Sequence, residues 1–222
     1  MRVIYDDNHI IVVQKESGEI VQGDKTGDLT LADMVKAYIK KKYAKPGNVF
    51  LGVAHRLDRP VAGLVVYAKT SKALTRLNRM FSSGEVHKTY WAITKNMPPE
   101  REGELTHWIV RNEKQNKSRA YATEKPHSKK AVLRYRLIAH SDNYNLIEVN
   151  LLTGRHHQIR CQLSAIGCPI KGDLKYGAPR SNPDGSISLL AHSIDFIHPV
   201  SKEPMHFEAE CPKSDIWDAF ER

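Results

Sequence analysis

The feature that most constrains this chain is one acid, Asp58, placed directly before a segment that belongs in a hydrophobic core. A Pro-x-x-Gly turn at residues 60–63 follows the acid, and the apolar run 64–68 behind the turn predicts a buried strand. A carboxylate on a loop that enters a core strand is held rigidly and can still face a cleft. Its neighbours on the loop are basic, namely His55, Arg56 and Arg59.

Two interpretations of Asp58 stay open on local composition. Neighbouring cations favour the charged form of a carboxylate, so we expect Asp58 to be ionised. Such an acid belongs either to a structural ion-pair cluster or to an active site, because both environments perturb carboxylates. Other parts of the chain are needed to separate the two.

The composition is basic, with 34 Lys and Arg against 25 Asp and Glu and a formal net charge of +9 at pH 7. Such an excess favours a polyanionic partner, because neutralised phosphates supply much of the affinity for nucleic acid. The three cysteines form no C-x-x-C pair, so we expect reduced thiols in a cytoplasmic protein rather than a disulfide or zinc framework. The sequence has neither a signal peptide nor an apolar run of about 18 residues, which predicts no membrane association.

The first third of the chain predicts a hairpin and two helices. Apolar residues around Asp6-Asp7-Asn8 favour a hairpin over residues 2–5 and 10–14. A helix follows Thr30 as its cap, and the basic residues 40–45 close it before Pro46-Gly47. A second helix is predicted from a Ser71 cap to Gly84, with Leu74, Leu77 and Phe81 facing inward.

Later segments are predicted to form runs of strands with interspersed helices. The absence of strict β-α-β alternation favours the α+β class with a largely antiparallel sheet. No repeat or linker marks a boundary, so we expect one domain, residues 1–222, acting as a monomer. The predicted elements are a strand around Tyr90, a basic loop and hairpin at 111–130, strands at 131–140 and 145–152, a helix at 156–166, strands near 190–197 and 205–210, and a helix at 214–221.

Three basic surfaces have two interpretations each. The residues 40–45 suit the negative end of a helix dipole and equally suit RNA. The outward face of the second helix and the segment 111–130 are either solvated or in contact with phosphates.

Three blocks of residues form a pattern beyond these local signals. Residues 55–64 read H-R-L-D-R-P-V-A-G-L, residues 88–90 read K-T-Y, and residues 153–160 read T-G-R-H-H-Q-I-R and continue through G-C-P-I-K-G-D to Tyr176-Gly177. In order and spacing they resemble the RluA-type family of pseudouridine synthases. Both ends of the chain are similar to that family as well. The departures, such as Val61-Ala62 where Thr-Ser is usual, remove no candidate catalytic group.

The resemblance implies a curved mixed sheet with flanking helices, a central catalytic cleft, and no RNA-binding module ahead of residue 1. It implies three catalytic residues: Asp58 as nucleophile or stabiliser of a cationic sugar, Tyr90 as stacking and proton-transfer group, and Arg160 as the partner that keeps Asp58 ionised. By local pattern alone Tyr90 would be a core tyrosine and Arg160 a surface residue. Candidate RNA contacts are Arg56, Arg59, Lys88, Arg155, His157 and Gln158.

Pseudouridine formation breaks the N-glycosidic bond, turns the uracil and rejoins it through carbon, which requires no cofactor and no metal. The resemblance implies an RNA partner, ribosomal or transfer, and base flipping is then expected, because a uridine in a stem must leave its stack to react. The pair His156-His157 does not indicate a metal site, because adjacent residues share no helix face and no partner completes a zinc set.

Two other functions remain open on the sequence. One is a non-catalytic RNA-binding module with the same fold, and the other is a general nucleic-acid chaperone. The presence of Asp58, Tyr90 and Arg160 together favours catalysis over both.

Overall fold

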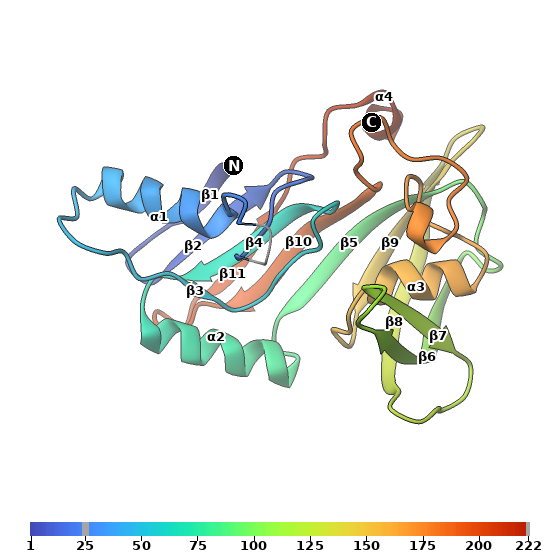
Figure 1. Cartoon of the computed structure of the whole chain (residues 1–222), viewed down its shortest axis with the longest axis horizontal. Coiled ribbons are helices and arrows are strands. Elements are labelled where there is room, and N and C mark those ends of the chain that lie inside the picture. The colour runs from blue at the N-terminus through green and yellow to red at the C-terminus, as the bar shows by residue number, and fades with distance from the viewer. Residues whose placement is uncertain (24–26, 221–222) are drawn as a thin grey trace. The chain divides into compact units, whose positions relative to one another are not determined.

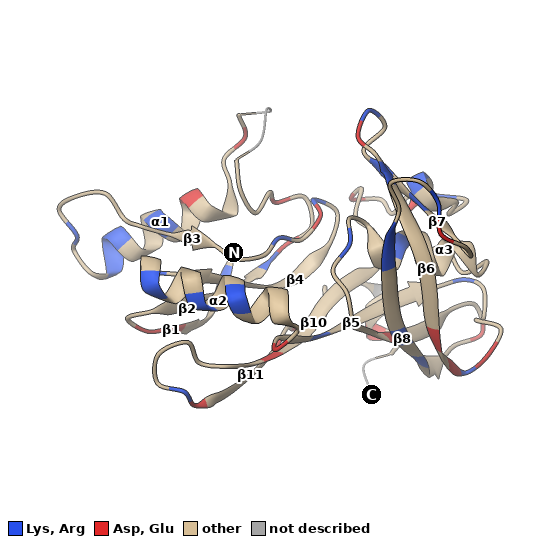
Figure 2. Ribbon diagram, turned by 90° about the horizontal axis from the view of Figure 1, so that it is seen from below, with Lys and Arg blue, Asp and Glu red and all other residues tan. Residues whose placement is uncertain are grey.

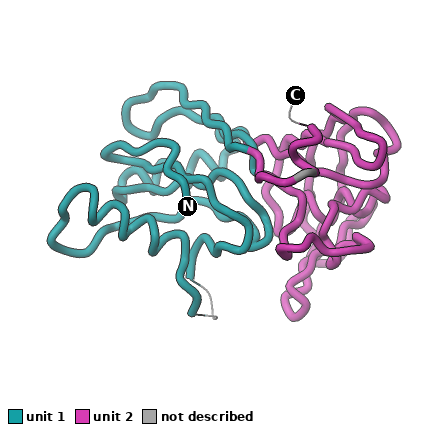
Figure 3. Tube along the Cα trace, turned by 90° about the horizontal axis from the view of Figure 1, so that it is seen from above, with its two compact units in different colours: residues 1–87, 191–210 teal, residues 88–190, 211–222 magenta. Residues whose placement is uncertain are grey.

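The computed structural model describes residues 1–23 and 27–220. The chain divides into two compact units, shown in separate colours in Figure 3. Residues 1–87 and 191–210 form unit 1, and residues 88–190 and 211–222 form unit 2. The single domain expected from the sequence stays a prediction.

Unit 1 contains two helices and a set of strands in which the pairs β1–β2, β2–β4, β3–β4 and β10–β11 are antiparallel (Figure 1). The predicted hairpin is confirmed, since β1 and β2 pair antiparallel. The strand order is β1-β2-β4-β10, with β3 paired to β4 and β11 paired to β10. The elements are β1 (Arg2–Asp6), β2 (Ile10–Lys15), α1 (Leu31–Lys42), β3 (Gly52–Val53), β4 (Ala62–Ala68), α2 (Ser71–Ser83), β10 (Leu189–Ile197) and β11 (Pro204–Glu208).

Helix α1 begins as predicted after Thr30, whose hydroxyl accepts a hydrogen bond from the Asp33 N–H at 3.1 Å in a reciprocal capping box. Its apolar face packs on β2 and β4 and forms the core of unit 1. Helix α2 has Thr70 rather than Ser71 as its cap, because the Thr70 hydroxyl is the one that accepts from the Ala73 N–H. Leu77 is fully buried as expected, and Gly84 ends the helix.

In unit 2 the strand order is β5-β9-β8-β6-β7, and each neighbouring pair of these strands is antiparallel. Helix α3 packs on β6 and β7, and the largely antiparallel pairing of the strands, with helices between them, confirms the α+β class. The elements are β5 (His87–Thr94), β6 (Glu102–Asn112), β7 (Lys117–Tyr121), β8 (Lys129–His140), β9 (Asn145–Leu151), α3 (Gln158–Ala165), the 3-10 helix η1 (Leu174–Tyr176) and α4 (Asp215–Asp218).

The segment 111–130 contains more regular structure than its sequence suggests. The predicted hairpin is present, and β6 and β7 pair from Trp108 with Tyr121 to Asn112 with Lys117. Helix α3 is shorter than the predicted 156–166, because His157 adopts a left-handed conformation with φ 53° and cannot be part of a right-handed helix. Helix α4 covers Asp215–Asp218 of the predicted 214–221, of which residue 221 lies outside the described residues.

Gly63, the glycine of the Pro-x-x-Gly turn, lies where β4 approaches β10 in unit 1. Its φ of 125° is one that side-chain-bearing residues rarely adopt, and a Cβ there would lie 2.4 Å from the Ala191 carbonyl oxygen. Because the obstacle is backbone, no side-chain rotation can relieve it. The turn after Asp58 therefore has room only for glycine.

We expect Gly63→Ala to lower the free energy of unfolding by about 3 kcal/mol or more, since it adds a backbone overlap to an unfavourable φ. Gly84→Ala is the matched control, because Gly84 also has a positive φ of 77° but no atom lies within 4 Å of the place that its Cβ would take. The control is expected to lose only about 1 kcal/mol. Equal losses for the two variants in urea titrations would contradict the close approach at Gly63.

Candidate active site

Asp58 is half-buried on the loop between β3 and β4 in unit 1. Its carbonyl accepts a hydrogen bond from the Val61 N–H at 3.1 Å, which closes the turn before β4. Leu57 packs against the core of the unit on one side of the acid. His55 fastens the start of the loop, because its Nε2 accepts from the Val66 N–H at 2.9 Å and its ring stacks on Phe81 at 4.6 Å.

Lys15, at the end of β2, holds the other side of the Asp58 loop. This lysine is fully buried, and its Nζ donates to the carbonyls of Arg59 at 3.0 Å and Val61 at 2.6 Å. A third bond goes to the Glu16 carbonyl at 3.0 Å. A charged donor shared by three carbonyls fixes the backbone on the C-terminal side of Asp58.

Burial lowers the pKa of Lys15 to about 8, while the nearby carboxylates of Glu19, Asp58 and Glu16 act in the opposite direction. The ammonium is thus mostly charged at neutral pH, in the vicinity of Asp58. The sequence analysis assigned Lys15 no role. The available signal was a lysine two positions after the apolar run 10–13, at the end of a strand that is buried throughout.

The two arginines beside Asp58 are exposed. Arg59 donates from Nε to the Gly18 carbonyl at 3.1 Å, and its Nη1 lies 3.2 Å from a carboxylate oxygen of Asp28. Arg59 therefore joins the Asp58 loop to the segment after β2. The prediction that Arg56 and Arg59 contact RNA stays a prediction.

Helix α2 carries basic residues along its surface, as does the end of α1 (Figure 2). Arg76 has a structural role, because its Nη1 donates a hydrogen bond to the Pro199 carbonyl at 2.7 Å. Lys72 and Arg79 remain exposed.

Tyr90 lies in β5 of unit 2, paired in register with Val149 of β9, and only 7% of its surface is exposed. Lys88 points to the same face of β5, because side chains alternate along a strand. Lys88 is half-buried, and burial lowers the pKa of its ammonium. The strand thus places a tyrosine and a partly desolvated lysine side by side.

The segment 153–158 forms a turn that Gln158 braces. The Gln158 Oε1 accepts from the Thr153 hydroxyl at 2.8 Å and from the Arg155 N–H at 2.9 Å, and its Nε2 donates to the Val132 carbonyl at 3.1 Å. Gln158 is buried, whereas Arg155 is exposed and donates from Nε to the Lys130 carbonyl. Gln158 thus has a structural role here, and RNA contact by either residue stays a prediction.

Arg160 is buried in α3 and forms a two-pronged ion pair with Asp173. Its Nε lies 2.7 Å from Oδ2, and its Nη2 lies 2.9 Å from Oδ1. The guanidinium carbon lies 5.0 Å from the centre of the Tyr176 ring. Burial excludes the surface interpretation of Arg160, and Asp173 holds the plane of the guanidinium in one orientation.

Tyr176 connects Arg160 to the β6–β7 hairpin. Its hydroxyl accepts from the Ser118 N–H at 2.8 Å and shares a hydrogen bond of 2.8 Å with His157 Nδ1. Burial raises the pKa of Tyr176 to about 12, so the hydroxyl stays protonated. Asp173 and Tyr176 were missed as functional residues, although both belong to the third block of the sequence pattern.

His157 is buried and stacks on His156 with ring centres 3.8 Å apart. The pKa of His157 is lowered to about 2, mainly by burial and to a smaller extent by the positive charge of Arg160. Because the Tyr176 hydroxyl is protonated and already accepts from the Ser118 N–H, we assign it as the donor to Nδ1 of the neutral ring, whose own proton then lies on Nε2. His157 therefore acts in the structure as a neutral acceptor, and its predicted contact with RNA is untested.

This shift predicts acid sensitivity. His157 takes up a proton near pH 6.5 in the unfolded chain but only near pH 2 in the folded protein. Its contribution to the free energy of unfolding is therefore fully present above pH 6.5 and is lost as the pH falls below that value. The loss between pH 6.5 and about 4 is expected to be about 3 kcal/mol. His157→Asn keeps an acceptor and tolerates positive φ, so it should flatten this slope in urea titrations.

His206→Asn is the control for this prediction, because His206 is exposed and the hydrogen bond to Asp195 raises its pKa. The stability that His206 contributes is present at low pH and is lost as pH rises. Its removal should leave the acid slope intact. An unchanged slope in His157→Asn would contradict the buried neutral imidazole.

Two absences were found within the described residues. No group of three or more His, Cys, Asp and Glu side chains in this part of the chain is placed to hold a metal ion. None of the helices formed by these residues is both long and apolar enough to cross a membrane.

Comparison with known proteins identifies similar sequences and folds. Residues 9–165 match the family model described as RNA pseudouridylate synthase. The chain is 30% identical over 223 residues to ribosomal large subunit pseudouridine synthase D of Zymomonas mobilis, covering 96% of this chain and 70% of that protein. It is 30% identical over 248 residues to the mitochondrial pseudouridylate synthase RPUSD4 of Xenopus tropicalis, with coverage of 95% and 76%.

The fold is similar to that of a solved human protein, RNA pseudouridylate synthase domain containing 4. The TM-score is 0.79 at 23% sequence identity, and the match covers 96% of this chain and 89% of that one. A second solved human protein, RNA pseudouridylate synthase domain containing 1, matches with a TM-score of 0.75 at 24% sequence identity. This match covers 98% of this chain and 86% of the human chain.

Proposed function

Because this chain belongs to the RNA pseudouridylate synthase family, whose members are isomerases, we propose that it converts one specific uridine of a structured RNA to pseudouridine. Family membership makes the chain an RNA pseudouridine synthase of the RluA type. The substrate and the roles of individual residues are our proposal. The name of the Zymomonas relative refers to the large ribosomal subunit, which favours ribosomal over transfer RNA.

The observation that carries the proposed mechanism is the fastening of the Asp58 loop. Lys15 donates hydrogen bonds to the carbonyls of Arg59 and Val61, and the turn that follows has room only for a glycine at position 63. A half-buried carboxylate on a rigid loop, near a buried ammonium, is preorganised to meet a ribose. In our proposal Asp58 either attacks the ribose or stabilises the positive charge that develops on it.

The other two roles follow from the residues of unit 2. Tyr90 offers an aromatic face for the detached uracil and a hydroxyl that can move a proton. In our proposal Arg160, oriented by Asp173, supplies a fixed positive charge that supports Asp58 in the reaction. The reacting uridine reaches these groups by flipping out of its stack.

The test is to incubate the purified protein with bulk RNA from cells that lack the gene. Nuclease digestion and mass analysis should then reveal new pseudouridine. Separate reactions with ribosomal RNA and with transfer RNA distinguish the two substrate classes. New pseudouridine in neither RNA fraction would overturn the proposal.

A further inference from the structure

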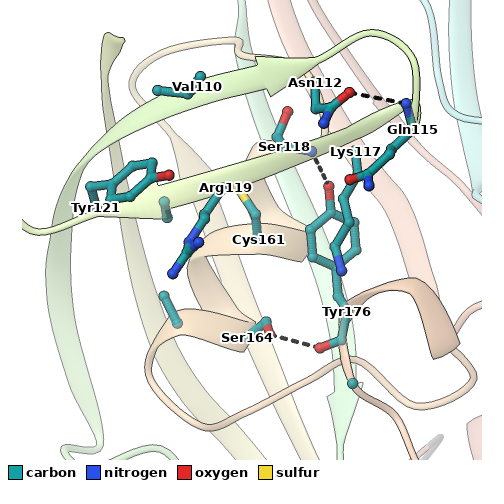
Figure 4. Close-up of a pocket in the computed structure, with 13 residues that line it drawn as sticks. Val110, Asn112, Gln115, Lys117, Ser118, Arg119, Tyr121, Cys161, Ser164 and Tyr176 are labelled. Atoms are coloured by element: carbon teal, nitrogen blue, oxygen red, sulfur yellow. Dashed lines mark hydrogen bonds between the residues drawn. The ribbon is translucent and has the colours of Figure 1, made fainter. Parts of the chain in front are cut away.

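A pocket of about 710 Å³ lies in unit 2, between the β6–β7 hairpin and helix α3 (Figure 4). Its volume falls in the range of small-molecule sites, about 300–1,000 Å³. The hairpin contributes Lys117, Arg119 and Tyr121, and the opposite side comes from Cys161, Ala165 and Tyr176. None of the residues assigned to catalysis lines it.

The cations and aromatic rings of the pocket are arranged in pairs. Alternation along β7 places Lys117, Arg119 and Tyr121 on one face of the strand. The Arg119 guanidinium lies 5.1 Å from the centre of the Tyr121 ring, and the Lys117 ammonium lies 5.4 Å from that of Tyr176. Figure 4 shows Arg119 and Tyr121 on one side and Lys117 and Tyr176 on the other.

The lining determines which ligand fits. Of the 13 residues that surround the pocket, two are cations and none is acidic, so the site favours an anion over a metal ion. Burial raises the pKa of Cys161 to about 12, which leaves its thiol protonated and a poor nucleophile. Cations next to aromatic rings, with amide and hydroxyl groups around them, suit the phosphate and the base of a nucleotide.

We propose that this pocket binds a nucleotide of the substrate RNA other than the uridine that reacts. In this arrangement Lys117 and Arg119 hold its phosphate, and Tyr121 stacks on its base. The inference rests on the proposed function, because it assumes that an RNA is the substrate. It adds a specific docking site to the general attraction of a basic chain for RNA.

The site is expected to act on affinity rather than on chemistry. Tyr176 separates the pocket from Arg160, since its ring borders the pocket and also lies 5.0 Å from the guanidinium carbon. The groups that would hold the nucleotide belong to the hairpin, whereas the Arg160 ion pair is formed with Asp173. Loss of the hairpin groups should therefore leave that ion pair in place.

The first test compares two double variants in binding to a fluorescein-labelled RNA stem–loop. Lys117→Ala/Arg119→Ala removes both pocket cations, while Lys95→Ala/Arg134→Ala removes the same charge from exposed positions outside it. The pocket variant should bind about tenfold more weakly, with a salt slope reduced by about 1, because the contact with one phosphate is lost. Equal weakening in the two variants would mean diffuse attraction and would overturn the proposal.

The second test blocks the pocket without changing its charge. Ala165 is exposed at the end of α3 and lines the pocket, so Ala165→Trp should fill part of the space while the fold is retained. We expect RNA binding to weaken at least about fivefold, whereas Ala165→Ser, which adds little volume, should bind as the wild type does. Normal binding by a folded Ala165→Trp protein would contradict an occupied pocket.

Two further measurements separate this proposal from its premise. At saturating RNA, the pocket variants should form pseudouridine in a single turnover at rates within about twofold of wild type. Wild-type catalysis with unchanged binding in the pocket variants would refute the pocket and leave the enzyme function intact. If free uridine 5′-monophosphate displaced the labelled RNA with an affinity equal to that of the RNA itself, the pocket would be a site for a free nucleotide, and the proposal would be overturned.

Discussion

Asp58→Asn is expected to abolish pseudouridine formation, with a loss on the order of 10⁴-fold or more in single-turnover rate. The amide has nearly the same shape as the carboxylate, but it can neither attack the ribose nor carry the negative charge. Because the Lys15 bonds to the Arg59 and Val61 carbonyls stay in place and the amide keeps the shape of the carboxylate, stability should change by only about 0.5 kcal/mol. RNA affinity should be unchanged or slightly tighter.

The control for Asp58→Asn is Asp142→Asn, which makes the same change at an exposed acid in the turn before β9. It should retain full activity. Both proteins need to come from cells without the wild-type gene, so that trace contamination cannot supply turnover. Substantial activity in Asp58→Asn would mean that another group performs the chemistry.

Arg160→Met should both destabilise the protein and remove its activity. Asp173 is only 1% exposed and accepts both bonds from the guanidinium, so the variant leaves a buried carboxylate without its partner. Breaking such a pair costs about 3–5 kcal/mol of unfolding free energy. Urea titrations measure the loss, and Arg160→Lys should fall in between, because it keeps the charge without the planar fork.

The double variant Arg160→Met/Asp173→Leu separates structure from catalysis. Replacing both members of a buried pair with apolar side chains should restore much of the stability. If Arg160 also supports Asp58, as we propose, activity stays lost in this stable protein. Recovery of wild-type turnover would restrict Arg160 to neutralising Asp173.

Much of the fold could be predicted from the sequence because its signals are local. The Thr30 cap and the apolar spacing behind it predicted α1, and two apolar runs around an Asp-Asp-Asn turn predicted the first hairpin. Strand β6 was not predicted as such. Much of its length is half-buried or exposed, so it lacks the continuous apolar run that predicted β4.

The candidate catalytic residues came from short blocks of sequence, which is why Asp58, Tyr90 and Arg160 could be named without a structure. The type and order of these residues are enough to indicate their chemistry. The residues that hold them in place cannot be identified in the same way, because they lie farther along the chain. Asp173 is 13 positions from Arg160, and the Arg59 and Val61 carbonyls are 44 and 46 positions from Lys15.

By itself, then, the sequence determined the class of fold, the family pattern and the identity of the reactive groups, all of which depend on neighbours along the chain. Only the tertiary structure decided that Lys15 lies buried beneath the Asp58 loop and that His157 is a neutral acceptor. It also decided that a Cβ at Gly63 would meet the backbone of Ala191. Burial and close approach depend on which distant segments pack together, and local periodicity carries no information about that packing.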